Sequence, residues 1–247
     1  MNSARHDIAA DAAIEIHTAI RRIIWTHPAI KQGGKALDAA AGTAYMSRWL
    51  WANGFIVTAM DIVTDGWNMS DIECKYSDFN RGIDAPDAIF DLVVSIETIE
   101  HLENPFHFLR EISRVLKSGG IGIISTPNTH SIRSRIKYFI VGLSRLFEYV
   151  ADDHMGNHIT PVNIGQFLHA FRQARMKLVD VYSVGPRNSF LLSTVLSLLY
   201  EMTFIDLKYF RKSRKSYPDH YVNALSDKRL RVLMNHGFLI VIAEKVD

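Results

Sequence analysis

Two carboxylates and an imidazole lie within five residues of one another in the stretch SIETIEHLENP, residues 95–105. If this stretch is helical, Glu97 and Glu100 share a face, and His101 lies one turn from Glu97. Side chains of these types can remove a proton from a reacting oxygen. The stretch directly follows the apolar run IFDLVVSIE, residues 89–97, which predicts a buried strand. We therefore expect the three side chains at the carboxyl edge of a parallel sheet, where such sheets bind ligands.

A second stretch, GKALDAAAGTAYMSRWLWANGFIVTAMDI (34–62), has the strand–loop–helix–strand order of a nucleotide-type cofactor site. A dinucleotide loop needs glycine at its first, third and sixth positions, which here hold Ala40, Gly42 and Tyr45. This argues against NAD and FAD, and the lack of a GxxxxGK[ST] loop argues against ATP and GTP. S-adenosylmethionine fits, since it has no phosphates. Asp61, twenty-three residues after Asp38, is placed to bind its ribose. The alternative is a tight turn without a ligand.

The remaining elements must place these two stretches at one edge, and their patterns predict an α/β fold. We expect a Rossmann-like, mainly parallel seven-stranded sheet, with helices on both faces and two helical insertions. The predicted strands are 35–40, 55–61, 73–79, 89–97, 119–128, 176–184 and 237–245. Helices are predicted from apolar spacing and capping residues at 8–25, 104–118, 130–150 and 160–171.

With these motifs in order, the chain resembles the class I S-adenosylmethionine-dependent methyltransferases over residues 30–128 and the two final strands. The first motif of that family, D-x-G-x-G-x-G, is represented by residues 38–44, where only Gly42 matches a motif glycine. Alanine in the first glycine position is a familiar variant, whereas Ala44 is a departure that we expect to crowd the loop or weaken the cofactor. The resemblance implies that Asp78 faces the adenine amino group, with Phe79 beside the ring. The implied cofactor-binding residues are Asp38, Ala40, Gly42, Asp61, Ile62, Asp78, Phe79 and Ser95.

The E-x-x-E-H spacing resembles two branches of that family in which a divalent metal is held by these residues and a later histidine. One branch makes quinone lipids, and the other methylates the terminal 2′-hydroxyl of small RNAs. The later histidine is His154 or His158, and His158, directly ahead of ITP, fits better. The implied metal ligands, for Mg²⁺, Mn²⁺ or Zn²⁺, are Glu97, Glu100, His101 and His158, and the implied catalytic residues are His101, Glu97 and His158. The alternative is a metal-free enzyme in which His101 is a base or positions the substrate.

We expect a single domain over residues 1–247, with an N-terminal helix (1–30), a cofactor-binding half (30–128), and insertions at 129–160 and 185–235. Both insertions combine apolar and basic residues, as in KYFRKSRK (208–215). They are expected to form a lid over the active site, to lie on an anionic membrane, or both. The expected acceptor is therefore a small or lipid-linked molecule, methylated on oxygen.

Composition limits the other classes of function. A net charge of +2 and the lack of a recognisable RNA-binding module make nucleic acid an unlikely partner. Cys74 is the only cysteine, which excludes an internal disulfide and fits a reducing cytoplasm. The N-terminus has no signal-peptide pattern and no apolar run is long enough to span a bilayer, so we expect a cytoplasmic protein, with peripheral membrane contact as the alternative. The competing functions are a methyltransferase fold that acts as a non-catalytic scaffold, and an RNA 2′-O-methyltransferase.

Overall fold

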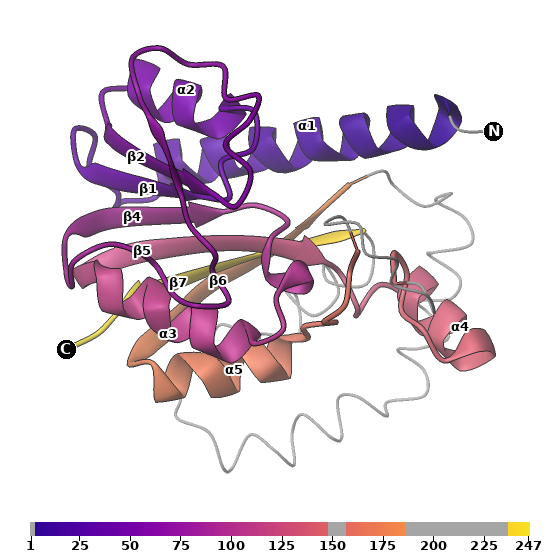
Figure 1. Cartoon of the computed structure of the whole chain (residues 1–247). Coiled ribbons are helices and arrows are strands. Elements are labelled where there is room, and N and C mark those ends of the chain that lie inside the picture. Colours follow the sequence, from indigo (N-terminus) through magenta and orange to yellow (C-terminus); the bar gives the residue numbers. More distant parts are fainter. Residues whose placement is uncertain (1–2, 148–156, 186–236) are drawn as a thin grey trace.

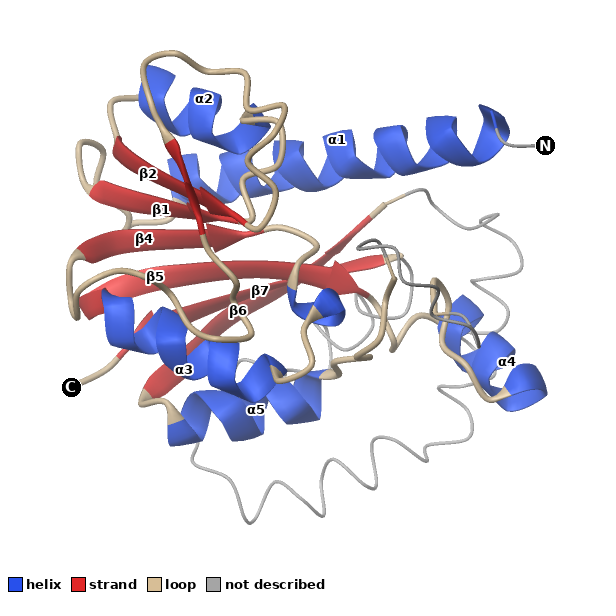
Figure 2. Ribbon diagram, viewed as in Figure 1, coloured by secondary structure: helices blue, strands red, loops and turns tan. Residues whose placement is uncertain are grey.

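Seven strands form one twisted sheet that is covered by helices on both faces (Figure 1 and Figure 2). The computed structural model describes residues 3–147, 157–185 and 237–247. The strands are β1 (Lys35–Ala39), β2 (Ile56–Asp61), β3 (Cys74–Tyr76), β4 (Phe90–Ser95), β5 (Leu116–Pro127), β6 (Met176–Val184) and β7 (Phe238–Lys245). The helices are α1 (Ser3–Thr26), α2 (Tyr45–Ala52), the short 3-10 helix η1 (Ile99–His101), α3 (Pro105–Val115), α4 (Ile132–Val141) and α5 (Ile164–Gln173).

The strand order is β3-β2-β1-β4-β5-β7-β6. The five strands β1 to β5 are parallel to one another, and β7 runs antiparallel to both β5 and β6. The predicted α/β class, with its mainly parallel seven-stranded sheet, is confirmed. Because the chain leaves β1 in one direction and returns to β4 on its other side, the carboxyl ends of these two strands flank the crevice in which open α/β sheets bind ligands.

Alternating side chains of each strand divide the core into two layers. On one face, Leu37 and Val93 belong to a buried cluster that includes the apolar sides of α3 and α5. On the other face, Leu92 and Val94 pack with the apolar residues of α1 and α2. This period of two, combined with burial on both faces, explains why the strands read as nearly continuous apolar runs in the sequence.

The predicted helix over residues 130–150 is too long, because α4 ends at Val141. Gly142 follows with φ of 74° and donates its N–H to the carbonyl of Tyr138, which is the left-handed glycine cap that stops many helices. The chain then turns back, and Lys137 Nζ donates to the carbonyl of Phe147 (2.7 Å). Residues 148–156, which include His154, and nearly all of the predicted 185–235 insertion lie outside the described residues.

The prediction that α3 continues to Gly119 is also wrong, because α3 ends at Val115 and β5 begins at once. The pairing between β4 and β5 shifts between Phe90 and Leu92, so residues 117–120 form an irregularity within the strand. A side chain at Gly120 would lie 2.8 Å from the carbonyl oxygen of Lys117. The glycine pair is therefore needed for the bulge of β5, not for a helix end.

Candidate active site

In the loop after β1, every second residue from Ala40 to Ala44 has left-handed backbone angles. Ala40, Gly42 and Ala44 have φ of 68°, 52° and 72°. The N–H groups of Ala40 and Ala41 both donate to the carbonyl of Met60 on β2 (2.9 and 3.1 Å). Alanine in this region costs about 1 kcal/mol relative to its ordinary conformation, so these bonds to β2 offset a real strain.

The methyl group of Ala44 is fully buried, whereas Gly42 and Thr43 are exposed. A side chain placed at Gly42 would meet no atom within 4 Å, so the space beside the loop is open. Ala44 therefore directs its methyl group into the protein and away from the side of the loop that a ligand can approach. The expectation that Ala44 crowds the loop or weakens cofactor binding stays a prediction.

Asp61, at the end of β2, connects this loop to the neighbouring strand. Its Oδ2 accepts the N–H of Gly42 and its Oδ1 accepts the N–H of Val63, both at 2.8 Å. The carboxylate is 9% exposed. Each oxygen keeps a second lone pair, so two ribose hydroxyls can still be accepted here, as the sequence predicts for Asp61. Ile62, the next predicted cofactor residue, is exposed beside it.

Asp38 lies beneath the loop, on β1, and is only 2% exposed. Its Oδ2 accepts the hydroxyl of Ser47 from α2 (2.6 Å). Burial raises the pKa of Asp38 to about 6, and the negative charge of Asp61 adds to the rise. Asp38 thus holds the start of α2 against β1 from inside the protein.

The raised pKa of Asp38 makes a prediction for stability. A carboxyl whose pKa is higher in the folded than in the unfolded chain stabilises fully below pH 3.8, and this contribution disappears as the pH rises through about 6. Asp38→Asn should remove this dependence, so between pH 3 and pH 8 its free energy of unfolding should gain about 3 kcal/mol relative to that of the unsubstituted chain. Urea unfolding of both proteins at several pH values measures the difference, and parallel pH curves would contradict the assignment.

The predicted adenine side of the site lies after β3. Asp78 accepts the N–H of Asn80 (3.0 Å) and pairs with the exposed Arg81 (3.3 Å). The ring of Phe79 is buried and packs against Phe108, with centroids 5.2 Å apart. Phe79 is therefore a core side chain here and offers no open face to a base.

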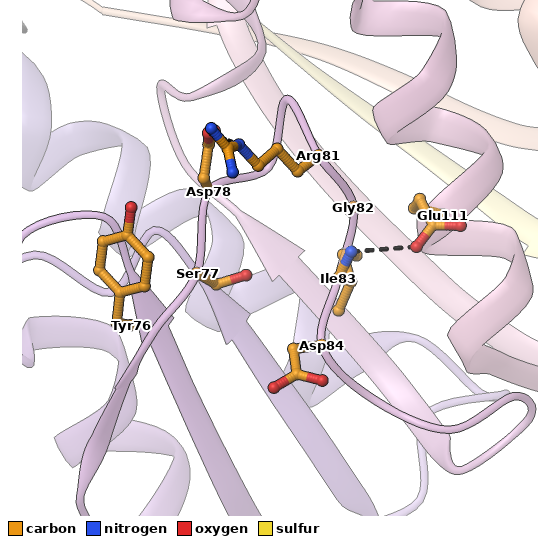
Figure 3. A pocket seen from close by; sticks show the side chains of 8 residues that line it. All are labelled: Tyr76, Ser77, Asp78, Arg81, Gly82, Ile83, Asp84 and Glu111. Carbon is orange, nitrogen blue, oxygen red and sulfur yellow. Dashed lines mark hydrogen bonds and ion pairs between the residues drawn. The ribbon is translucent and has the colours of Figure 1, made fainter.

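A cavity of about 360 Å³ lies beside Asp78 (Figure 3). It is lined by residues between Tyr76 and Asp84 and by Glu111 of α3, whose Oε2 accepts the N–H of Ile83 (3.0 Å). Its volume is within the range of small-molecule sites.

The carboxylates predicted to do chemistry follow β4 directly. Glu97 has φ of 50°, an unusual angle for this residue type. Two bonds to Ser125 of β5 hold it there: the N–H of Glu97 donates to Ser125 Oγ (3.0 Å), and Ser125 Oγ donates to Glu97 Oε1 (2.9 Å). Ser125 was not predicted from the sequence. The polar pair Ser125–Thr126 at the carboxyl end of an apolar strand is the signal that could have found it.

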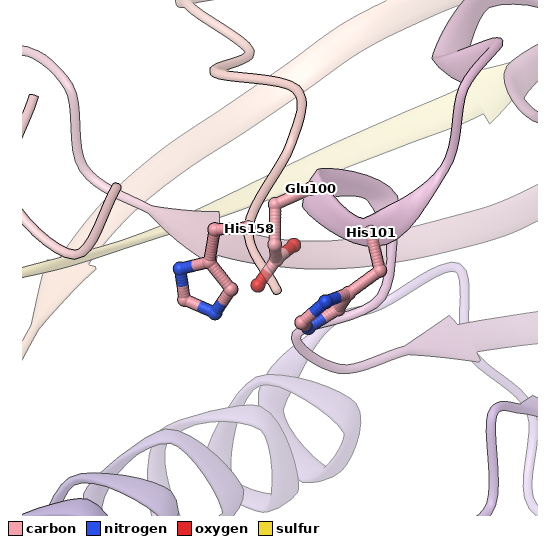
Figure 4. Close-up of side chains that lie close together, drawn as sticks. All are labelled: Glu100, His101 and His158. Atoms are coloured by element: carbon pink, nitrogen blue, oxygen red, sulfur yellow. The ribbon is translucent and has the colours of Figure 1, made fainter. Parts of the chain in front are cut away.

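Glu100, His101 and His158 meet one turn further on (Figure 4). One ligand atom from each lies within 4.8 Å of the other two, and the two imidazole centroids are 4.8 Å apart. His158 arrives from a distant part of the chain because the N–H groups of Ile159 and Thr160 both donate to the carbonyl of Glu100 (2.9 Å each). The predicted partnership of Glu100, His101 and His158 is thus present in the structure, whereas Glu97 is not in this group and faces Ser125.

Hydrogen bonding determines which ring nitrogen of His101 is free. Its Nδ1 lies 2.9 Å from the carbonyl oxygen of Asn157. A carbonyl only accepts, so Nδ1 carries the proton, and in the neutral ring Nε2 keeps its lone pair. His101 is therefore arranged to accept a proton or bind a cation through Nε2.

Burial makes the uncharged forms of this cluster favourable. It raises the pKa of Glu97 to about 8, and burial together with the negative charge of Glu97 raises the pKa of Glu100 well above its ordinary value. Burial lowers the pKa of His101, and burial and then the positive charge of His101 lower that of His158 to about 4. Titratable groups with strongly shifted pKa values in one cleft are typical of active sites.

The cluster also has unsatisfied polar atoms. Both carboxyl oxygens of Glu100 and the Nδ1 of His158 are buried without a hydrogen-bond partner. Ser95, a predicted cofactor residue at the end of β4, has a buried hydroxyl in the same condition. Buried polar atoms nearly always have partners, so these atoms fit a site that a ligand or cation completes.

A comparison with models of known protein families finds a match over most of the chain. A family model described as "Methyltransferase domain" matches residues 9–181. This chain is 30% identical to a ubiquinone biosynthesis O-methyltransferase of Rickettsia typhi over 99 residues. The match covers 37% of this chain and 40% of that protein's length.

Two solved structures have the same fold at low sequence identity. An S-adenosylmethionine-dependent methyltransferase from Archaeoglobus fulgidus is 19% identical with a TM-score of 0.54, over 93% of both chains. The 1,6-didemethyltoxoflavin-N1-methyltransferase of Burkholderia thailandensis, with bound S-adenosylhomocysteine, is 16% identical with a TM-score of 0.52, over 99% of this chain and 83% of that chain.

Proposed function

This chain belongs to the methyltransferase-domain family, and from that premise we propose that it transfers the methyl group of S-adenosylmethionine to an oxygen of a small or lipid-linked acceptor. The observation that carries the proposal is the position of the Asp61-anchored loop and the Glu100–His101–His158 cluster along the carboxyl ends of neighbouring strands. The loop supplies the cofactor side, and the cluster supplies groups that can take a proton from the acceptor.

The mechanism requires little covalent work from the protein. The sulfonium group is the leaving group, so the protein must align the acceptor oxygen with the methyl carbon and exclude water. An alcohol or phenol must also lose its proton. His101 suits this role because its pKa is lowered and its Nε2 lone pair is free, so the ring is neutral and basic at pH 7.

The residues also fit a divalent metal, because Glu100 and His158 have buried ligand atoms without partners. Glu100, His101 and His158 would hold it. Two imidazoles and one carboxylate suit Zn²⁺ or Mn²⁺ better than Mg²⁺, which prefers oxygen ligands. A cation at this position would lower the pKa of an acceptor hydroxyl. Glu97 would remain beside the site, bonded to Ser125.

Methylation on oxygen is favoured over methylation on nitrogen by two features. A buried group that accepts a proton is needed for a hydroxyl, and the similar protein from Rickettsia typhi is named an O-methyltransferase. An RNA 2′-O-methyltransferase and a non-catalytic scaffold are the competing functions, and each predicts a different result in the experiment below.

The experiment is calorimetric titration with S-adenosylmethionine and S-adenosylhomocysteine, each with and without Zn²⁺, Mn²⁺ or Mg²⁺. We expect micromolar binding of both ligands, followed by acceptor-dependent formation of S-adenosylhomocysteine with catechol and phenol acceptors. No binding under any condition would support the scaffold. Salt-sensitive binding and methylation of oligonucleotides would support the RNA enzyme.

A lipid-linked acceptor is supported by α4, which carries large apolar side chains in the open. Phe139 is 90% exposed, and Tyr138 and Ile140 are 62% and 71% exposed. Arg133 and Lys137 lie on the same helix, a combination typical of surfaces that rest on anionic membranes. No helix in the described part of the chain is long and apolar enough to span a bilayer.

Phe139→Ser should therefore lower the partition of the protein into phosphatidylglycerol vesicles about tenfold, since burying one aromatic side chain in the interface contributes about 1.5–3 kcal/mol. Sedimentation with vesicles measures this change. The control is Tyr76→Ser, which is also exposed but lies on the edge strand β3 and not on α4. Equal losses in both variants, or no loss in either, would contradict a specific role of α4.

A further inference from the structure

Two side chains of α1 pack against the aromatic ring of Tyr45, the first residue of α2. The imidazole of His17 meets this ring edge to face, with centroids 4.6 Å apart. The guanidinium carbon of Arg21 lies over the same ring, 4.4 Å from its centroid, and 5.6 Å from the centroid of Trp49. His17 and Arg21 are four residues apart, so they share one face of α1. The N-terminal helix is thus joined to the start of α2 by stacked side chains.

Hydrogen bonding and charge both favour this contact. The Nη2 of Arg21 donates to the carbonyl oxygen of Tyr45 (3.3 Å). The Nε of Arg21 and the Nδ1 of His17 are buried and make no hydrogen bond within the described residues. Burial, and then the charge of Arg21, lowers the pKa of His17 to about 4, so the imidazole is neutral at pH 7 and does not repel the guanidinium. The cation therefore lies over the electron-rich face of the ring without a competing charge from His17.

The same ring follows the last residue of the cofactor loop. Ala44, directly before Tyr45, is the N-cap residue of α2 and has φ of 72°. Alanine has no side-chain oxygen, so this cap cannot fix the first turn of the helix by a hydrogen bond. A left-handed angle at alanine persists only where the surrounding contacts maintain it. Met60 and Asp61 of β2 hold one side of the loop, and Tyr45 gives the loop an attachment at its α2 end.

We infer that Arg21 is a positioning residue of the proposed enzyme, which holds the left-handed end of the cofactor loop in its binding conformation through Tyr45. Arg21 belongs to α1, so a helix outside the strand–loop–helix–strand unit takes part in cofactor affinity. This role requires no contact between Arg21 and the ligand. The inference rests on the proposed function, because it concerns the affinity of the same loop for its cofactor.

The first test is calorimetric titration of the whole chain with S-adenosylhomocysteine. Arg21→Ala should weaken binding about three- to tenfold, because the loop loses a cation–π contact that fixes it. Arg21→Lys should keep part of the affinity, since a cation remains near the ring. Arg22→Ala removes the same charge from the next, exposed position of α1 and should leave the affinity unchanged. Equal affinities of Arg21→Ala and Arg22→Ala would overturn the inference.

A double-mutant cycle determines whether Arg21 acts through Tyr45. Tyr45→Leu should weaken binding as Arg21→Ala does, because it removes the ring from the same contact. The double variant should bind no more weakly than Tyr45→Leu alone. Additive losses would show that the two side chains act independently, which contradicts the inference.

Hydrogen exchange of the ligand-free protein separates this inference from the proposed function. The N–H groups of Ala44 and Arg48 are hydrogen-bonded, to the carbonyls of Ala41 (3.0 Å) and Ala44 (2.9 Å). Both should exchange faster in Arg21→Ala than in Arg22→Ala, whereas the amides of β5 should exchange equally. Equal rates at the loop, or an equal increase in β5, would overturn the positioning role. If the unsubstituted chain does not bind S-adenosylhomocysteine, the proposed function fails, and the exchange rates still decide whether Arg21 holds the loop.

Discussion

Replacing His101 with alanine is expected to lower the rate of methyl transfer by a factor of about 10² to 10⁴, the usual contribution of a positioned general base. The affinity for S-adenosylmethionine should change little, because the bonds that hold the cofactor loop come from Asp61 and Met60 of β2, whereas His101 follows β4. Single-turnover kinetics and titration on the same samples measure the two quantities. A variant that kept its full rate would remove His101 from the mechanism.

Glu100→Gln provides a second variant that does not depend on the histidine. The carboxyl oxygens of Glu100 are buried without close partners, and glutamine has nearly the same volume, so the substitution should change the free energy of unfolding little. A fall in rate with unchanged stability would then reflect chemistry and not unfolding. Glu103→Gln is the control, since Glu103 is exposed three residues further along. Equal effects of the two substitutions would contradict the role of Glu100.

Replacing Asp61 with alanine should weaken S-adenosylmethionine binding at least about a hundredfold. Two ribose hydroxyls would lose charged acceptors, each worth about 1.5–3 kcal/mol. The loop would also lose its anchor, because the N–H groups of Gly42 and Val63 both donate to this carboxylate. Both effects act in the same direction, so the loss should exceed that from either alone.

Two further variants separate these effects. Asp61→Asn keeps the volume but presents an amide NH₂ to one of the two N–H donors, so it should also weaken binding. Asp65→Ala removes an exposed carboxylate four residues away and should have no effect. Calorimetric titration compares all three, and unchanged affinity in Asp61→Ala would show that the ribose is bound elsewhere.

The sequence was sufficient to predict the fold and the position of the loop because their determinants are local. Apolar runs of strand length, the loop between Asp38 and Tyr45, and the acid after β2 are each contained in a short stretch. The fold class followed from their alternation with helices. The partnership of His158 with Glu100 and His101 was predicted through a family resemblance and not from local spacing.

The features that were missed depend on contacts between distant segments. The bonds between Ser125 and Glu97 require the register of β5 against β4, which no local pattern reveals. The buried position of Phe79 depends on α3. The guanidinium of Arg145 lies against Gly237, ninety-two residues further along the chain. The end of α4 at Gly142, in contrast, could have been predicted locally, had the glycine been weighted above the apolar spacing.

The alanines of the loop after β1 have a consequence for the thermodynamics of ligand association. Alanine samples fewer backbone states than glycine, so a loop containing Ala40 and Ala44 has less conformational entropy to lose when a ligand fixes it. The strain of their left-handed angles is present before the ligand arrives and lowers the stability of the empty protein. Preorganisation of this kind improves affinity by reducing the entropic penalty of binding. The loss of two motif glycines is therefore compatible with a loop that is already shaped for its cofactor.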